Sequence, residues 1–171
     1  MIKQFRKAEI SEINQIWQII KDAVQRRKED GSNQWQDGYP NPEVLQNDIE
    51  KETGFVLTEN DVIIGYCAIL INDEPEYINI KGKWLTTNDF IVFHRVAIAK
   101  EYLGKGFAKI IFNHIEDFAR SKNIYSVKAD TNFDNFAMIA LFEKMTYVYC
   151  GEVSFRGSPR KAYEKNLIPN N

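Results

Sequence analysis

The 171-residue chain is 44% hydrophobic and 27% charged, as ordinary globular proteins are, and its length predicts one domain, residues 1–171, with its own core. A net charge of −2 and a pI of about 5.8 exclude a nucleic-acid binder that relies on a basic surface. The first residues lack an apolar signal region and no run is long enough to span a membrane, so a cytoplasmic protein is expected.

The two cysteines, Cys67 and Cys150, are far apart in the sequence, and each lies in an apolar, strand-like run. This placement predicts buried free thiols in a reducing compartment. It argues against a disulfide framework and against a metal site.

The first forty residues predict a strand, a helix and a loop. Residues 2–6 alternate apolar and polar side chains, which indicates a short strand. Apolar residues at helical spacing then predict a helix from Ser11, its expected N-cap, to a stop near Gly31. The polar loop 31–40 follows, and its Trp35 and Tyr39 either fill a gap in the core or line a binding cleft.

A second helix and a hairpin come next. Asn41 and Pro42 are a typical cap and first residue for a helix that reaches about Lys51. Two apolar runs, 55–58 and 62–71, predict an antiparallel hairpin. Gly65 inside the second run indicates a bulge or a close backbone approach.

The middle of the chain predicts a parallel strand pair. Residues 73–88 are polar and aromatic and are expected to leave the sheet. The apolar strand 90–98 is followed by a glycine-rich loop and an amphipathic helix. The strand 125–129 comes after this helical crossover, so the two strands should be parallel.

The C-terminal part predicts one more helix, starting after Asn132–Asn135, and two strands, 147–155 and 160–166. The turn 156–159 joins these strands. Because edge strands can pair between chains, a monomer or a homodimer is expected.

The loop Leu103–Ala108 is the clearest binding motif. Gly104 and Gly106 stand directly before a helix, where backbone N–H groups and the positive end of the helix dipole can bind phosphate oxygens. Lys105 adds a positive charge. A tight turn without a ligand is the alternative. The loop matches neither the Walker A motif nor the dinucleotide fingerprint.

The order of the predicted elements and two motifs resemble the GNAT superfamily of acetyl-CoA-dependent N-acetyltransferases. The family's Arg/Gln-x-x-Gly-x-Gly/Ala motif falls on Leu103–Ala108, where Gly106 and Ala108 match and Leu103 replaces Arg or Gln. The family's Asn…Leu-Tyr-x-Lys-Leu segment resembles Asn135 followed by residues 141–145, where Phe142 replaces the tyrosine that is often the general acid.

The resemblance implies a mixed α/β fold: a central, mostly antiparallel sheet with one parallel, splayed strand pair and about four flanking helices. It implies transfer of an acetyl group from acetyl-CoA to a primary amine of a small molecule or peptide. Asn135 is either a cofactor contact or only a helix cap. The implied cofactor contacts are Val96, Ala97, Ile98, Leu103, Gly104, Lys105, Gly106, Phe107, Ala108, Asn135 and Phe142.

The catalytic candidates follow from the need to deprotonate the amine. His94 is the candidate base, with Asp130 and Glu76 as carboxylate alternatives. If the strand is regular, His94 and Arg95 face opposite sides, so only one of them faces the substrate. Phe142 has no proton to donate, so Tyr147 or Tyr149 is the acid, or the thiolate leaves unassisted.

The acceptor pocket is expected to have aromatic walls and carboxylates that attract an ammonium group. The expected walls are Trp35, Tyr39, Tyr77 and Trp84, and the carboxylates are Asp37, Glu74 or Glu76. A non-catalytic acyl-CoA-binding sensor or partner module with the same fold is the alternative function. A nucleotide-phosphate module is a third hypothesis.

Overall fold

A computed structural model describes residues 1–168. The chain divides into two compact units. Unit 1 contains Met1–Ile69 and Arg95–His114, and unit 2 contains Leu70–His94 and the chain from Ile115 on. The divisions therefore fall within a strand at residues 69 and 70, within a strand at residues 94 and 95, and within a helix at residues 114 and 115.

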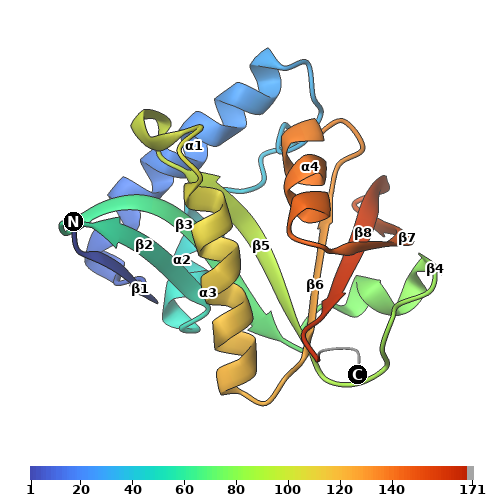
Figure 1. The fold of residues 1–171 in the computed structure, drawn as a ribbon. Helices are drawn as coiled ribbons and strands as arrows, with labels where there is room; N and C mark the ends of the chain where they lie inside the picture. Colours follow the sequence, from blue (N-terminus) through green and yellow to red (C-terminus); the bar gives the residue numbers. More distant parts are fainter. Residues whose placement is uncertain (169–171) are drawn as a thin grey trace. The chain divides into compact units, whose positions relative to one another are not determined.

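The strands form one eight-stranded sheet with the order β1-β2-β3-β5-β6-β8-β7-β4, mostly antiparallel with β5 and β6 parallel (Figure 1). The predicted fold class is confirmed. The strands are β1 Lys3–Lys7, β2 Gly54–Glu59, β3 Val62–Ile71, β4 Lys81–Gly82, β5 Phe90–Ile98, β6 Ser126–Thr131, β7 Val148–Phe155 and β8 Ser158–Asn166. The helices are α1 Ile13–Glu29, α2 Pro42–Glu50, α3 Phe107–Ser121 and α4 Phe136–Lys144, with the short 3-10 turns η1 Ile10–Glu12, η2 Pro75–Asn79 and η3 Lys100–Tyr102.

In unit 1, α1 and α2 bury apolar side chains against the sheet residues of the same unit. The fully or nearly fully buried members of this core include Ile16, Ile20, Leu45, Val56 and Tyr66. Their spacing of three or four residues in the helices explains why these segments are helical.

The start of α1 differs from the prediction. Ser11 is not the N-cap, because it lies inside the turn η1. A capping box formed by Glu9 and Glu12 begins that turn instead, and Glu12 also receives two hydrogen bonds from Arg6, of 3.0 and 2.6 Å. Sequence reasoning favours Ser at a cap, but a glutamate pair meets the same need for acceptors.

The second helix and the hairpin agree with the prediction. The side chain of Asn41 accepts a hydrogen bond from Val44 N–H (3.0 Å), which caps α2. The antiparallel register of β2 and β3 shifts beside Gly65, and a Cβ at Gly65 would lie 2.8 Å from Ile111 Cδ1 and 3.3 Å from the Ala97 carbonyl oxygen. Gly65 therefore marks both a bulge and a close backbone approach.

In unit 2, β6 lies between β5 and β8, and β7 pairs with β8 and with the short strand β4. Residues 73–88 leave the sheet through η2 and return only as β4. The turn between β7 and β8 places Arg156 and Gly157 at positive φ, as a tight hairpin turn requires. The strand β8 is internal, so β7 is the C-terminal strand nearer an edge.

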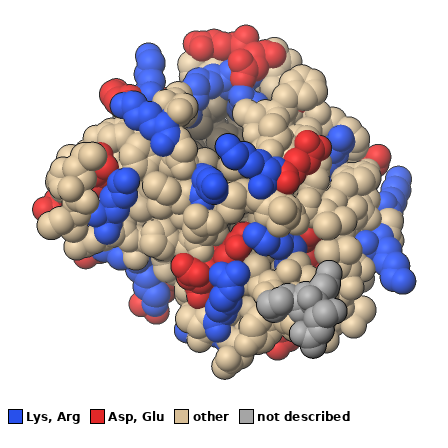
Figure 2. Space-filling model, viewed as in Figure 1, with Lys and Arg blue, Asp and Glu red and all other residues tan. Residues whose placement is uncertain are grey.

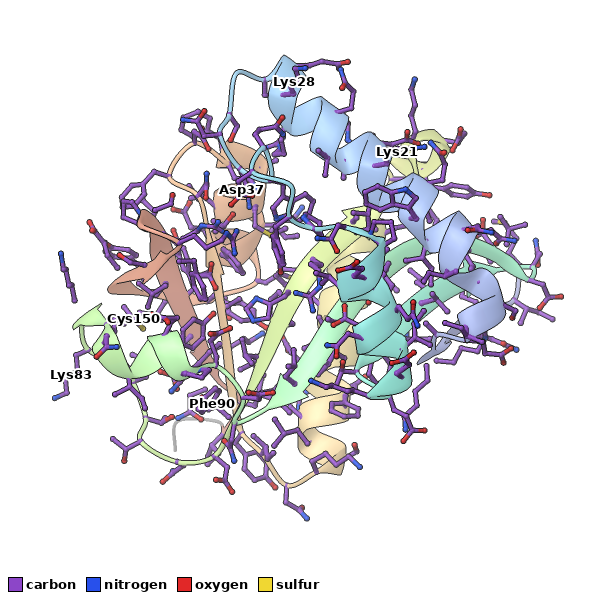
Figure 3. All side chains as sticks on the ribbon, turned by 180° about the vertical axis from the view of Figure 1, so that it is seen from behind. Lys21, Lys28, Asp37, Lys83, Phe90 and Cys150 are labelled. Atoms are coloured by element: carbon purple, nitrogen blue, oxygen red, sulfur yellow. The ribbon has the colours of Figure 1, made fainter. Side chains whose placement is uncertain are left out.

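Charged side chains of both signs are interspersed on the face that Figure 2 shows. Both cysteines are free and buried, as predicted, and Figure 3 shows Cys150 near Lys83, whose N–H donates to the Cys150 carbonyl (2.9 Å). No helix among residues 1–168 combines the length and hydrophobicity needed to cross a bilayer.

Candidate active site

The strand β5 is interrupted at Arg95, which adopts φ +56°. A non-glycine residue at positive φ costs of the order of 1–3 kcal/mol and persists only when its surroundings hold it there. The assumption of a regular strand is therefore wrong, and so is the inference that His94 and Arg95 must face opposite sides. The division between the units falls on the peptide bond that joins these two residues.

A buried network in unit 1 holds Arg95. Its Nε–H and Nη2–H groups donate to Oδ2 and Oδ1 of Asp48 at 2.9 and 2.6 Å, and Nη1–H donates to the Tyr39 hydroxyl. The Tyr66 hydroxyl donates to Asp48 Oδ2 at 2.7 Å. The Arg95 and Asp48 side chains are only 8% and 4% exposed. Although burial opposes the charge, Tyr39 and Asp48 raise the pKa of Arg95.

Beyond this interruption, β5 pairs in unit 1 with β3. Ala99 N–H donates to the Ile64 carbonyl oxygen (2.9 Å). The parallel ladder of β5 with β6 lies in unit 2 and covers Phe90–Val92 against Ser126–Lys128. The register thus ends before Val96, Ala97 and Ile98, the predicted partners of an extended ligand.

The glycine loop of unit 1 is open and exposed. Gly104 and Gly106 have φ of +72° and +82°, and a Cβ at either would meet nothing within 4 Å. The first turn of α3 is bonded from Ile110 N–H to the Gly106 carbonyl (3.3 Å), so the N–H groups ahead of Ile110 are those that a helix leaves for caps or anions. Lys105 lies over the Tyr102 ring, with Nζ 5.4 Å from its centroid.

His94 pairs with a carboxylate in unit 2. Its Nε2 is 2.8 Å from Glu74 Oε2, and the two side chains are 17% and 13% exposed. A carboxylate next to one ring nitrogen fixes the orientation and tautomer of an imidazole. Glu74 lies directly before η2, the turn that starts the excursion from the sheet.

Asp130 lies in the same unit, at the C-terminal part of β6. Its Oδ1 accepts a hydrogen bond from the Tyr77 hydroxyl (2.7 Å), and its Oδ2 is 3.8 Å from Arg160 Nη1. Burial raises the pKa of Asp130, although His94, Tyr77 and Arg160 oppose that rise. Burial and the Asp130 carboxylate raise the pKa of the Tyr77 hydroxyl well above its usual value. Two acidic groups, one imidazole and one guanidinium are therefore electrostatically coupled.

The aromatic residues predicted to bind substrate have internal partners. In unit 2, Tyr77 is 3% exposed and its ring centroid lies 4.9 Å from that of Trp84, whose Nε1–H donates to the Tyr77 carbonyl (2.9 Å). Buried Lys128 lies over Trp84 (4.5 Å to the centroid), and burial lowers its pKa. In unit 1, Trp35 packs on the core and Tyr39 bonds to the Arg95 guanidinium.

Phe142 and Tyr147 belong to the aromatic core of unit 2. Phe142 is 1% exposed and stacks on Tyr163, with 4.6 Å between centroids. Burial, with the carboxylate of Glu116, raises the pKa of the Tyr147 hydroxyl well above its usual value. Tyr149 is half exposed.

The structure does not bring Glu76 into the His94 cluster, because Glu76 is exposed on η2. Asn135 is the N-cap of α4, since its Oδ1 accepts a hydrogen bond from Met138 N–H at 3.2 Å. Residues 1–168 contain no group of three or more His, Cys, Asp or Glu side chains that could hold a metal ion.

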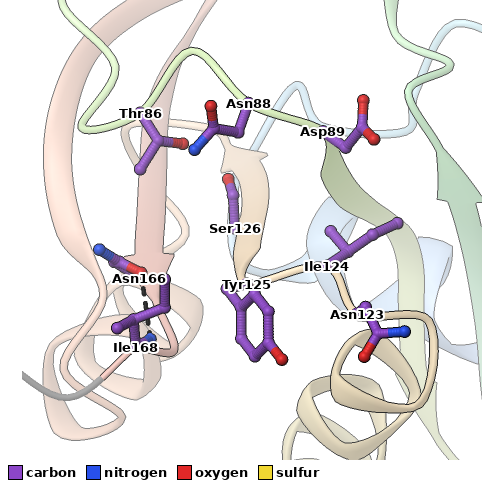
Figure 4. A pocket seen from close by; sticks show the side chains of 9 residues that line it. All are labelled: Thr86, Asn88, Asp89, Asn123, Ile124, Tyr125, Ser126, Asn166 and Ile168. Carbon is purple, nitrogen blue, oxygen red and sulfur yellow. Dashed lines mark hydrogen bonds between the residues drawn. The ribbon is translucent and has the colours of Figure 1, made fainter.

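Unit 2 also contains a polar cavity of about 270 Å³, to which β6 contributes Ser126 (Figure 4). Amide and hydroxyl side chains dominate its lining, and Asn166 Oδ1 accepts a bond from Ile168 N–H (3.1 Å). None of the predicted catalytic, cofactor or substrate residues lines it.

Comparison with known proteins gives the family. The model of the acetyltransferase (GNAT) family matches residues 15–147, most of the chain. The chain belongs to this family. The resemblance seen in the sequence is confirmed, and this GNAT protein is an acyltransferase.

Solved structures agree. A GNAT-family acetyltransferase from Streptococcus agalactiae is 33% identical, with a TM-score of 0.90 over 98% of this chain and 96% of that chain. The protein yncA from Salmonella typhimurium, determined with its cofactor acetyl-CoA, is 16% identical with a TM-score of 0.71, covering 100% and 97%. A ribosomal-protein-alanine N-acetyltransferase from Brucella melitensis is 17% identical with a TM-score of 0.70, covering 96% and 99%. A comparison with curated proteins finds no match.

Sequence reasoning missed the partners of the site residues. Glu74 was a candidate only for attracting an ammonium group, and neither Asp48 nor Arg160 was a candidate. One signal was available for Asp48, because it follows Leu45 by three residues and so lies on the buried face of α2. Arg95, a charged residue inside an apolar strand, was a second signal that a buried counter-ion was needed.

Proposed function

We propose that this GNAT protein transfers the acetyl group of acetyl-CoA directly to a primary amine of a small molecule or peptide, with His94 as general base and Glu74 as its orienting partner. The observation that carries the proposal is the 2.8 Å pair of His94 and Glu74 at the residue that directly precedes the interruption of β5. The family membership supplies the reaction class.

The residues of unit 1 fit acetyl-CoA. The space around Gly104 and Gly106 lets phosphate oxygens approach the backbone of Leu103–Ala108, where a helix begins. Val96–Ile98 offer peptide groups that can pair with an extended arm as an added strand would. Leu103 is compatible with this, because backbone N–H groups then supply the phosphate contacts that an Arg side chain would add.

When bound, acetyl-CoA supplies a thioester whose carbonyl carbon a neutral amine can attack. Glu74 accepts the Nε2 proton of His94 and so leaves the lone pair on Nδ1 to take a proton from the amine. The backbone N–H of Val96, which follows the interruption, is the proposed donor to the acetyl oxygen. Asp130 is the alternative proton acceptor, and its raised pKa suits that role.

Phe142 carries no proton, so it cannot protonate the departing thiolate. The raised pKa of Tyr147 makes this buried hydroxyl a poor donor, and its neighbour is the Glu116 carboxylate. We therefore propose that the thiolate leaves without a protein acid. In unit 2, Asn135 and Phe142 remain proposed cofactor contacts, and Tyr77 and Trp84 remain proposed substrate contacts, as Trp35 and Tyr39 do in unit 1.

The test is a thiol-release assay with acetyl-CoA and a panel of primary amines and peptides with free N-termini. His94→Ala should lower kcat/KM by about 10²–10⁴-fold and remove the acidic limb of the pH profile. Glu74→Gln should show a smaller loss and a shifted limb, because the imidazole stays but loses its charged partner.

His114→Ala is the matched control. His114 is the other histidine of the chain, and in unit 1 it stacks on Phe5 with 4.8 Å between ring centroids. Its removal should leave kcat/KM unchanged. An unchanged rate and pH profile in His94→Ala would remove His94 from the mechanism. Binding of acetyl-CoA without thiol release for any amine would instead support the sensor hypothesis.

The remaining parts of the proposal concern organisation. We propose that the whole chain, residues 1–171, acts as one acetyltransferase domain, which the coverage of the Streptococcus agalactiae structure supports. The balanced charge supports an acceptor other than nucleic acid. A cytoplasmic location and a monomeric or homodimeric state complete the proposal.

A further inference from the structure

The positive φ of Arg95 is held by contacts from three separate parts of unit 1. Asp48 lies on α2, Tyr66 on β3, and Tyr39 in the loop between α1 and α2. Asp48 receives two hydrogen bonds from Arg95 and one from Tyr66, so its carboxylate is well supplied with donors although it is buried. The fork geometry requires the planar guanidinium, which a lysine ammonium cannot reproduce.

A buried ion pair is weak evidence for stability, since an apolar pair of similar volume often stabilises a protein as well or better. What the pair does provide is a fixed direction. Arg95 must leave the extended conformation for its side chain to meet Asp48, and a residue of this kind re-aims the backbone that follows it.

We propose that Arg95 is a positioning residue: its fork with Asp48 and its bond to Tyr39 hold β5 in the interrupted conformation that aims Val96 N–H. The inference rests on the proposed function, because Val96 N–H is the proposed donor to the acetyl oxygen. It assigns a role in the rate to two charged residues that touch neither the donor nor the acceptor. Such a role predicts a fall in kcat at nearly constant KM.

The test compares Arg95→Lys with Arg6→Lys. Arg6 makes a similar fork in the same unit, with bonds of 3.0 and 2.6 Å to Glu12, but it lies on β1. Arg95→Lys should lower kcat about 10–100-fold, within the range known for a misplaced oxyanion donor. It should change KM for acetyl-CoA less than threefold and leave the shape of the pH profile intact, since His94 is unaltered. Arg6→Lys should retain kcat within twofold.

A second readout needs no activity. Hydrogen–deuterium exchange of the peptide that covers Arg95–Ile98 should be faster in folded Arg95→Lys than in the wild type and unchanged in Arg6→Lys. If Arg95→Lys does not fold, the variant Arg95→Met with Asp48→Leu removes both charges together, and the same loss of kcat and faster exchange are expected.

Wild-type kcat together with wild-type exchange in a folded Arg95→Lys or Arg95→Met/Asp48→Leu protein would overturn the inference. A loss of kcat that merely follows the folded fraction would overturn it as well. If the wild type releases no thiol with any amine, the proposed function fails, and the exchange experiment still decides whether the fork holds β5.

Discussion

The hydrogen bond between Tyr77 and Asp130 gives a prediction whose size and pH dependence follow from the geometry of unit 2. Tyr77→Phe removes one O–H donor, 2.7 Å from a buried carboxylate, and keeps the ring that packs against Trp84. A hydrogen bond to a charged group contributes about 1.5–3 kcal/mol. Since one pKa unit corresponds to about 1.4 kcal/mol, the pKa of Asp130 should rise by roughly a further 1–2 units.

The sign of the pH dependence follows from the raised pKa of Asp130. Stability linked to a group with a raised folded pKa is fully present below its ordinary pKa and is lost as the pH rises through the folded pKa. Tyr77 opposes this loss because it stabilises the charged carboxylate. Tyr77→Phe should therefore cost about 1.5–3 kcal/mol at pH 8, and only about 0.5–1.5 kcal/mol at pH 4, where the bond is between neutral groups.

The assay is urea unfolding of both proteins at intervals from pH 4 to pH 8. Tyr66→Phe is the matched control, because Tyr66 also donates to a buried aspartate at 2.7 Å, but Asp48 keeps two bonds from Arg95. Its deficit should change less with pH. The reasoning is refuted if the Tyr77→Phe deficit is the same at pH 4 and pH 8, or if it stays below about 0.5 kcal/mol at pH 8.

Three further predictions concern single positions of unit 1. Gly65→Ala should destabilise the protein by about 1–3 kcal/mol in urea unfolding, because the added Cβ would lie 2.8 Å from Ile111 Cδ1; a neutral result would show that the core can yield there. Asn41→Ala should cost about 1 kcal/mol through loss of the α2 cap, whereas Asn41→Asp should retain most of the stability. Gly106→Ala should raise the Kd for CoA measured by calorimetry, because a residue with a Cβ disfavours φ +82° and alters the loop; unchanged affinity would argue against the phosphate cradle.

Much of the site's local structure was predictable because neighbouring residues determine it. The glycine loop, its helix and the Asn41 cap follow from short-range preferences. Gly65 was expected at a bulge or a close approach, and the structure shows both. The Ser11 cap failed for a local reason too, since a glutamate pair replaced the favoured residue type.

The sequence by itself determined the family, the order of the elements and the two motifs, because spacing and residue type encode periodicity, caps and turns. Only the tertiary structure decided which charges meet: His94 with Glu74, Arg95 with Asp48, and Tyr77 with Asp130 are separated by 20, 47 and 53 residues. It also decided that β5 departs from a regular strand at Arg95. No local preference favours that conformation for an arginine, and its cause is a buried carboxylate on a helix far away in the sequence.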